Sequence, residues 1–204
     1  MTSEFLPASE GPSVVLVRHG ETTWSKSGRH TSTTDVGLTA AGREQARSVG
    51  DALRAQRFAL VLSSPRKRAH DTAVLAGFDE PLIDANLVEW DYGALEGRTS
   101  ADISAEIGHQ WTIWSAEPPE PVPAESADDV AERADAVIAR LREVTSQGQD
   151  AVVFSHAHFL RVLAARWLGL PPTEGARLAL STGSISELGF EHGLPVIARW
   201  NARP

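Results

Sequence analysis

Short apolar runs alternate along the chain with segments in which apolar residues recur every three to four positions. Uninterrupted apolar runs at residues 14–17, 60–62 and 151–154 are typical of strands that are buried on both faces. Residues 82–87 form a further candidate strand. Near the C-terminus, residues 185–190 and 196–200 flank a turn-like segment, which predicts a hairpin.

Helical periodicity fills the intervals between these runs. The predicted helices span about residues 39–53, 65–75, 126–147 and 156–168. Thr39 and Ser126 are suited to cap two of them, and Pro65 is suited to the first turn of another. Gly148 is expected to end the helix that begins near Ser126. The proline-rich segment 115–125 excludes helix and central strand, so we predict a loop there.

The alternation of strands and helices predicts an α/β fold, a three-layer sandwich in which helices cover both faces of a mostly parallel central sheet. A length of 204 residues suits one domain. We place this domain at residues 13–204, behind a flexible N-terminal tail at residues 1–12. The tail lacks the basic and apolar regions of a secretory signal, and no apolar run is long enough to cross a bilayer.

Charge and cysteine content narrow the function classes further. A net charge of -8 argues against binding to nucleic acid. The absence of cysteine excludes disulfides and thiolate zinc sites. Together with the short apolar runs, these features predict a cytoplasmic protein whose partners include neither nucleic acid nor membrane.

Polar side chains follow three of the predicted strands at the point where each strand ends. Arg18 and His19 follow the first strand, a Ser-Ser-Pro-Arg-Lys-Arg run at 63–68 follows the second, and His156 follows a later one. Ligands bind at the carboxyl ends of parallel strands, so we expect these groups to share a site. Guanidinium groups match phosphate oxygens, and a histidine among them suits attack on phosphorus. The sequence therefore predicts a phosphoryl site.

Each of these groups alone also has an ordinary explanation, such as a surface turn or a solvated helix face. His156 and His158 are conceivable metal ligands, but no further histidine or carboxylate stands at a suitable spacing, so no metal is expected. A non-catalytic module that only binds phosphorylated ligands also stays open at this point.

Five motifs stand along the chain in a fixed order. They are Arg18-His19-Gly20-Glu21-Thr22 with Trp24, then Leu38-Thr39-Ala40-Ala41-Gly42, then Ser63-Ser64-Pro65-Arg66-Lys67-Arg68-Ala69 with Thr72-Ala73, then Glu89-Trp90-Asp91-Tyr92-Gly93 with Glu96-Gly97, and finally Ser155-His156. In this order they resemble the histidine phosphatase superfamily, in the branch that includes cofactor-dependent phosphoglycerate mutases. The run SHAHFLR at 155–161 makes the chain most similar to bacterial acid phosphatases of that branch.

The resemblance implies a role for each of five residues. His19 is the nucleophile that becomes phosphohistidine, Arg18 and Arg68 clamp the phosphate, and His156 bonds the phosphoryl oxygens. Glu89 is the general acid that protonates the leaving oxygen. Physical chemistry supports the first role, because guanidinium groups lower the pKa of a neighbouring imidazole and keep it neutral for attack. An acceptor on the second ring nitrogen is then needed to fix the tautomer.

Weaker candidates for substrate binding are Ser25, Thr31 and Ala157. Ser25 stands where many family members have Asn, and Ala157 stands where Gly is usual. Ser32 also departs from the pattern, since Gly is frequent at its position. The role of His158 is open between contact with substrate and exposure to solvent.

The implied activity is hydrolysis of small phosphorylated metabolites, independent of metal and with no cofactor. The alternative within the branch is a cofactor-dependent phosphoglycerate mutase. The short insert between Glu89 and His156, and Trp90 where mutases carry a basic residue, favour the phosphatase. A homodimer is an open expectation from the resemblance, since no feature of the sequence identifies an interface.

A lid over the site is expected from the segment after Gly97, which contains Trp111 and Trp114, and from the proline-rich loop. For the two tryptophans, ordinary core packing is the preferred alternative.

Overall fold

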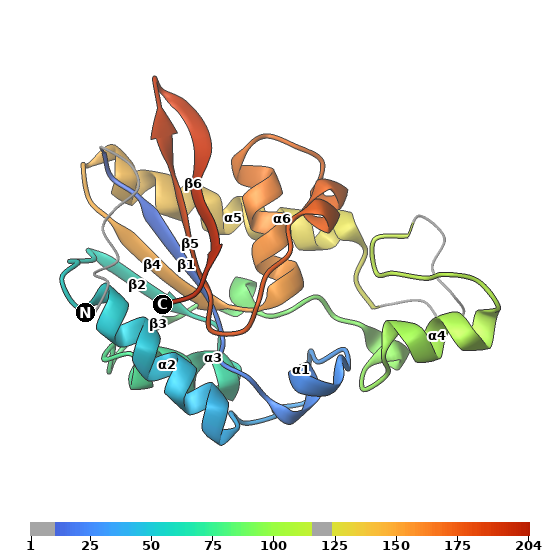
Figure 1. Cartoon of the computed structure of the whole chain (residues 1–204). Coiled ribbons are helices and arrows are strands. Elements are labelled where there is room, and N and C mark those ends of the chain that lie inside the picture. Colours follow the sequence, from blue (N-terminus) through green and yellow to red (C-terminus); the bar gives the residue numbers. More distant parts are fainter. Residues whose placement is uncertain (1–10, 116–123) are drawn as a thin grey trace.

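One mixed sheet forms the centre of the computed structural model, which describes residues 11–115 and 124–204 (Figure 1). The strands are β1 (Val14–Arg18), β2 (Leu60–Ser63), β3 (Leu82–Ile83), β4 (Ala151–Ser155), β5 (Ile185–Glu191) and β6 (Leu194–Ala202). Their order is β3-β2-β4-β1-β5-β6. The first four strands in this order are parallel, whereas β5 is antiparallel to both of its neighbours. The predicted fold class and the predicted C-terminal hairpin are therefore confirmed.

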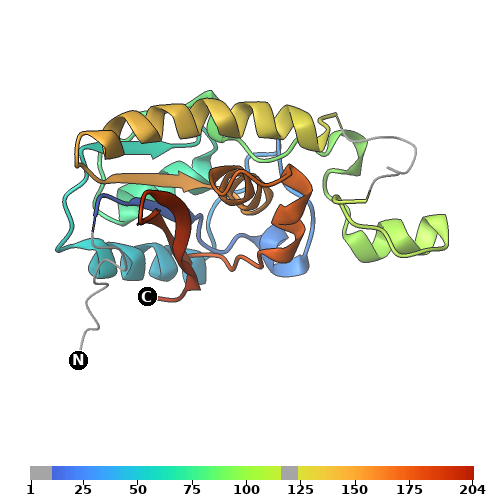
Figure 2. The same ribbon diagram turned by 90° about the horizontal axis from the view of Figure 1, so that it is seen from above.

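Helices cover both faces of this sheet. They are α1 (Thr23–Ser27), α2 (Ala40–Leu53), α3 (Lys67–Leu75), α4 (Ser100–Ile107), α5 (Ala127–Ser146) and α6 (Ala157–Trp167), with 3₁₀ turns at Ala85–Leu87, Gly93–Leu95 and Pro172–Arg177. Figure 2 shows the strands between α5 on one side and α2 on the other. Among the described helices, none is long and apolar enough to cross a membrane.

The apolar runs form strands because both of their faces are covered. Val14 and Leu16 pack into the core beneath α5 and α6, whereas Val15 and Val17 pack into the core beneath α2 and α3. Side chains alternate across a strand, so a strand buried on both faces needs an apolar residue at every position. The central strands β1 and β4 are therefore packed on both faces up to the ends that carry the site residues.

Three of the predicted boundaries are wrong. In the C-terminal hairpin, β6 begins at Leu194, inside the segment predicted to be the turn. The helix predicted from Pro65 begins at Lys67, because Arg66 is extended and the amide of Lys67 donates to Asp35 Oδ1 at 2.8 Å. The strand predicted at 82–87 ends at Ile83. There the carboxylate of Asp84 accepts from the amide of Asn86 at 2.9 Å and caps a 3₁₀ turn instead.

The two predicted N-terminal caps, Thr39 and Ser126, are confirmed. Thr39 accepts a hydrogen bond from the amide of Gly42 at the start of α2, and Ser126 forms a capping box with Asp129 at the start of α5. The pattern did not predict α1 and α4, which are too short for a clear apolar period. Residues 1–10 and 116–123 lie outside the described residues, so the flexible tail, the domain limits and most of the proline-rich loop stay predictions.

Candidate active site

The ends of three neighbouring strands meet at one edge of the sheet. Arg18, the last residue of β1, is in register with Ser155, the last residue of β4. Ser63, the last residue of β2, is in register with Phe154 on the other side of β4. The segments that follow these strands therefore start side by side, as the sequence predicted, and each carries its polar groups to the same place.

His19 is held in one tautomer. Its Nδ1 lies 2.8 Å from the carbonyl oxygen of Gly20, which can only accept, so Nδ1 carries the hydrogen and Nε2 carries the lone pair. Gly20 itself is fixed, because its amide donates to Thr72 Oγ1 at 3.0 Å. A Cβ on Gly20 would lie 2.3 Å from the carbonyl oxygen of Gly42, so no larger residue fits there. The acceptor expected for the second ring nitrogen is thus the neighbouring backbone carbonyl.

The imidazole of His19 is neutral. Burial, together with the charges of Arg68 and Arg18, holds the pKa of His19 well below its usual value of 6.5, although the hydrogen bond to Gly20 raises it slightly. Desolvation disfavours the charged ring, and nearby cations disfavour it further. A neutral imidazole with a free lone pair is the form that attacks phosphorus.

Two arginines bring positive charge to the site, Arg68 fully buried and Arg18 half-buried. Arg68 is fully buried on α3, and its guanidinium donates to the carbonyl oxygens of Thr31 at 3.0 Å and Thr34 at 3.2 Å. Arg18 donates to the carbonyl oxygen of Leu180 at 2.5 Å. Burial lowers the pKa of both arginines, and the nearby charge of Glu89 opposes this shift. A guanidinium stays protonated near neutral pH, so the site retains two positive charges.

His156 has one free ring nitrogen. Its Nε2 lies 2.8 Å from Ser64 Oγ, which already accepts from the amide of Arg66 at 3.3 Å. In the tautomer with the ring hydrogen on Nδ1, Nε2 accepts from the hydroxyl of Ser64 and Nδ1 is a donor without a partner. The ring centroid lies 5.2 Å from that of His19, and burial with the charge of Arg68 lowers the pKa of His156 well below 6.5.

Buried donors without partners gather at this site. In the described part of the chain, the buried side-chain nitrogens that lack a hydrogen-bond partner are Arg18 Nε, Arg66 Nε, Arg68 Nε, His156 Nδ1 and Trp111 Nε1. Leaving a buried donor unsatisfied costs about 1–3 kcal/mol, so such groups are rare without a reason. Three of the five belong to residues that the sequence assigned to phosphate binding. An oxyanion is the ligand that would satisfy them.

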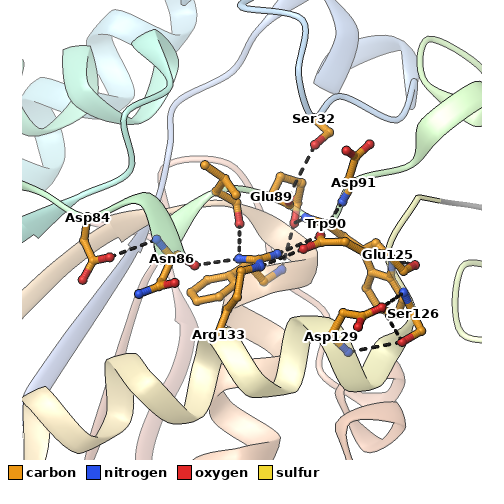
Figure 3. A network of polar contacts seen from close by, with 12 residues as sticks. Ser32, Asp84, Asn86, Glu89, Trp90, Asp91, Glu125, Ser126, Asp129 and Arg133 are labelled. Atoms are coloured by element: carbon orange, nitrogen blue, oxygen red, sulfur yellow. Dashed lines mark hydrogen bonds and ion pairs between the residues drawn. The ribbon is translucent and has the colours of Figure 1, made fainter.

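Glu89 lies at the N-terminus of α6 and is almost fully buried, with 4% of its surface exposed. Its carboxylate accepts from the amides of Phe159 at 2.8 Å and His158 at 3.1 Å, in the first turn of that helix. The amide of Trp90 donates to the same carboxylate at 3.0 Å (Figure 3). The positive end of a helix suits a carboxylate. Both oxygens are therefore held in place.

A cavity of about 240 Å³ opens beside His19 and Glu89. Its lining includes most of the predicted site residues, namely Arg18, His19, Ser25, Thr31, Glu89, Ala157 and His158. It also includes Gly28, Arg29, His30, Tyr92 and Ser100, which the sequence did not identify individually. Arg68 and His156 do not line the cavity, since both are fully buried beside it, so their contact with a phosphoryl group stays a prediction.

The hydroxyls of two weaker candidates have local partners. Ser25 Oγ accepts from the amide of Thr22 at 2.8 Å and donates to its carbonyl at 3.1 Å, which caps α1. Thr31 Oγ1 donates to the carbonyl oxygen of Arg29 at 3.0 Å. Ala157 is the first residue of α6. Binding of substrate by these three residues stays a prediction.

Ser32 takes part in the loop that Arg68 holds. Its carbonyl oxygen accepts from Arg68 at 3.3 Å, and its hydroxyl lies 3.5 Å from the carbonyl oxygen of Glu89 (Figure 3). The amide of Ser32 donates to Glu96 at 3.0 Å. The serine that departs from the family pattern thus lies between Arg68 and Glu89 and touches both.

His158 is half-buried and lines the cavity. Its Nδ1 lies 2.6 Å from the hydroxyl of Tyr92, and the ring meets Trp114 edge-on with centroids 5.4 Å apart. Burial, followed by the charge of Arg161, holds its pKa well below 6.5.

The two tryptophans expected in a lid or in the core lie at the core. Trp111 is buried in it, and Trp114 packs against it. Within the described ranges, no three His, Asp or Glu side chains group as metal ligands.

A pH dependence of stability follows from His30, which lines the cavity and is 8% exposed. Burial lowers the pKa of His30 from 6.5 to about 4. As the pH falls below about 6.5, the unfolded chain takes up this proton and the folded protein does not. The free energy of unfolding should therefore decrease between about pH 6.5 and about pH 4, with His30 contributing at most ~1.4 kcal/mol per pH unit. Urea denaturation at several pH values measures this slope.

The variant His30→Gln should reduce that slope, because it removes one of the buried groups that titrate differently in the two states. The exposed His109 offers a matched control, and His109→Gln should leave the slope as it is in the wild type. Equal slopes for His30→Gln and the wild type would contradict the contribution of His30 to the pH dependence of stability.

Comparison with known proteins agrees with this geometry. The family model described as histidine phosphatase superfamily (branch 1) matches residues 14–203. An acid phosphatase of Mycobacterium tuberculosis is 42% identical over 187 residues, which cover 91% of this chain and 90% of that protein. A Citrobacter koseri protein named "Probable phosphoglycerate mutase GpmB" is 33% identical and covers 92% of this chain and 89% of its own length.

The fold has a close match among solved structures. A protein of Mycobacterium tuberculosis superposes with a TM-score of 0.87 at 40% identity, over 94% of this chain and 98% of that one. The family match spans the strand ends, the helix that carries Arg68 and the segment with Glu89. The chain belongs to the histidine phosphatase superfamily, branch 1.

Proposed function

We propose that this chain hydrolyses phosphomonoesters of small metabolites through a phosphohistidine at His19, with no metal or cofactor. The observation that carries the proposal is the state of His19, a buried neutral imidazole whose Nε2 lone pair is free and whose Nδ1 is tied to a carbonyl. Binding alone would require neither a fixed nucleophile nor a buried carboxyl in the same cavity. The non-catalytic module is therefore the weaker explanation.

In the first half-reaction, the Nε2 lone pair of His19 attacks phosphorus as the ester P–O bond breaks. The leaving oxygen takes a proton from the carboxyl of Glu89, which lines the same cavity. Charge that develops on the equatorial oxygens of the phosphoryl group is stabilised by the guanidinium groups and by His156. The two guanidinium groups supply the positive charge that a metal supplies in other phosphatases, and His156 contributes as a neutral hydrogen-bonding group.

In the second half-reaction, Glu89 acts in the opposite sense. Its carboxylate takes a proton from water as the water oxygen attacks phosphorus, the N–P bond breaks and inorganic phosphate leaves. His19 regains its lone pair and Glu89 its proton, so both groups are ready for another turnover.

The chemistry of the cavity wall beside His19 and Glu89 favours a substrate with an uncharged leaving group. His30, Tyr92 and His158 form a cluster of rings in which the His30–Tyr92 centroids lie 4.6 Å apart. Burial lowers the pKa of both histidines and raises the pKa of Tyr92, so all three rings are neutral near pH 7. Such a surface suits the hydroxyls and carbons of a sugar or polyol phosphate.

The mutase is the second candidate, and the similarity to the Citrobacter koseri protein favours it. Trp90 weakens it, because the residue after Glu89 is a buried indole whose Nε1 donates to the carbonyl oxygen of Glu125 at 2.8 Å. No basic side chain is available at that position to bind the carboxylate of a phosphoglycerate.

Phosphate release in the presence of EDTA tests the proposal. The expected result is release from p-nitrophenyl phosphate and from several members of a panel of sugar and polyol phosphates. With 3-phosphoglycerate, conversion to 2-phosphoglycerate should be slow compared with any release of phosphate. Fast conversion without release would establish the mutase, and loss of all turnover in EDTA would point to a metal-dependent reaction.

Two further expectations stay predictions. The lack of cysteine supports a cytoplasmic location. A homodimer is expected only from the resemblance, and light scattering on the purified protein would determine the oligomeric state.

A further inference from the structure

The segment that carries Glu89 has little regular structure of its own. Residues 88–92 lie between the 3₁₀ turns Ala85–Leu87 and Gly93–Leu95 and belong to no helix or strand. A proton donor works only when it is held close to the geometry of the transition state. The position of Glu89 therefore depends on contacts that other segments make with this stretch.

Arg133, on α5, holds the stretch on the N-terminal side of Glu89. Its Nη1 donates to the carbonyl oxygens of Asn86 at 2.6 Å and Val88 at 3.1 Å (Figure 3). Its guanidinium also lies over the ring of Phe159, 5.1 Å from the centroid. The amide of Phe159 is one of the donors to the carboxylate of Glu89. Arg133 thus contacts both the peptide that carries the carboxyl group and a residue that binds it.

Glu125 holds the stretch on the C-terminal side of Glu89. Its carboxylate accepts from the amide of Asp91 at 2.8 Å, and its carbonyl oxygen accepts from Trp90 Nε1 at 2.8 Å (Figure 3). The amide of Glu125 donates in turn to the carbonyl oxygen of Asp91 at 3.2 Å. The two residues that follow the acid are therefore fixed by one partner.

Arg133 and Glu125 also hold each other. Nε and Nη2 of Arg133 donate to the two carboxylate oxygens of Glu125 at 2.8 and 2.9 Å, a bidentate pair. Their side chains are only 17% and 21% exposed, so solvent screens this pair less than a pair on the open surface. Removal of either side chain breaks its own contact with the segment. It also leaves the remaining side chain of the pair without its partner, which loosens the second contact.

We infer that Arg133 and Glu125 are positioning residues for the proton transfer by Glu89. This inference rests on the proposed function, in which Glu89 protonates the leaving oxygen as the P–O bond breaks. Neither side chain lines the cavity. The pair acts on the reaction only through the place at which it holds the carboxyl group, and its loss should weaken catalysis selectively where that proton is needed.

The dependence of the rate on the leaving group tests this role. An alkyl phosphate such as glycerol phosphate releases a strongly basic alkoxide that needs the proton, whereas p-nitrophenolate leaves readily without it. For Arg133→Met, we expect kcat/KM to fall about 10- to 100-fold with glycerol phosphate and by no more than about threefold with p-nitrophenyl phosphate. Glu89→Gln, measured alongside, should show the same selectivity with a larger loss.

A matched control comes from another bidentate pair on the same side of the sheet. Arg166 donates to both carboxylate oxygens of Asp135 at 2.9 and 2.8 Å, and neither residue contacts Glu89. Arg166→Met should leave the ratio of the two kcat/KM values at that of the wild type. Glu125→Gln provides a second variant if Arg133→Met fails to fold, as judged by circular dichroism.

The outcomes separate this inference from the proposed function. A selective loss in Glu89→Gln together with an equal loss on both substrates in Arg133→Met would overturn the positioning role and leave the role of Glu89 intact. An equal loss on both substrates in Glu89→Gln itself would overturn the role of Glu89 as general acid. The positioning role of Arg133 and Glu125 would then fall with it.

Discussion

Replacement of His19 by alanine is expected to abolish phosphate release, with a loss in kcat of at least about 10⁴-fold on p-nitrophenyl phosphate. The variant lacks the Nε2 lone pair that the proposed mechanism uses to attack phosphorus, so the phosphohistidine cannot form at this position. The fold should survive, because the backbone amide of His19 still donates to the carbonyl oxygen of Ser155. Steady-state kinetics with EDTA present measures the effect.

The exposed His109 provides the control for this substitution. His109→Ala should retain the kcat of the wild type, which excludes a general effect of removing a histidine. His19→Ala should still bind inorganic phosphate, since both arginines are present. An increase in the thermal unfolding temperature on addition of phosphate measures this binding. Turnover within about tenfold of the wild type in His19→Ala would show that another group is the nucleophile.

The second large effect is expected for Arg68→Met, with a loss in kcat/KM of about 10³-fold. Arg68 supplies one of the two guanidinium charges next to His19, and it also holds the loop at residues 31–34 through three carbonyl oxygens. Its loss therefore removes transition-state stabilisation and loosens one wall of the cavity. Arg68→Lys should restore little activity, because one ammonium group cannot reproduce the planar fork.

Arg66 provides the comparison within the same motif. Arg66 is half-buried and donates to the carbonyl oxygen of Thr33 at 3.3 Å, whereas Arg68 is fully buried. Arg66→Met should lower kcat/KM less than about tenfold. A larger loss in Arg66→Met than in Arg68→Met would show that the phosphate-clamping arginine has been assigned to the wrong position.

The sequence predicted those parts of the molecule that follow from local pattern and from topology. Apolar runs buried on both faces identified β1, β2 and β4. The rule that ligands bind at the carboxyl ends of parallel strands then brought Arg18, His19 and His156 together. Glu89 was different, because it lies in a stretch without regular structure and only the family resemblance singled it out.

The errors arose where a single side chain decides the local structure. The carboxylate of Asp84 converts the end of a predicted strand into a 3₁₀ turn, and Asp35, far along the chain, receives the first amide of α3. Neither effect changes the pattern of apolar residues. Boundaries set by such side-chain caps are therefore hidden from an analysis of periodicity.

The sequence also did not predict the cluster of rings at the cavity wall or the contacts of Arg133 and Glu125 with the segment that carries Glu89. Tyr92 and His158 are 66 positions apart and meet only because the first turn of α6 lies against the segment with Glu89. Arg133 was expected to lie on a helix, yet nothing in the chain assigned it to backbone carbonyls of residues 86 and 88. Contacts of this kind depend on tertiary packing.

The most direct test of the account is to trap the phosphoryl group on the enzyme during turnover. The reaction with p-nitrophenyl phosphate is stopped within milliseconds in alkali, which preserves phosphohistidine, and the peptides are analysed by mass spectrometry. The predicted result is a phosphoryl group on His19 in the wild type and none in His19→Ala. Turnover without any phosphorylated peptide, or a phosphoryl group on a different residue, would contradict the mechanism.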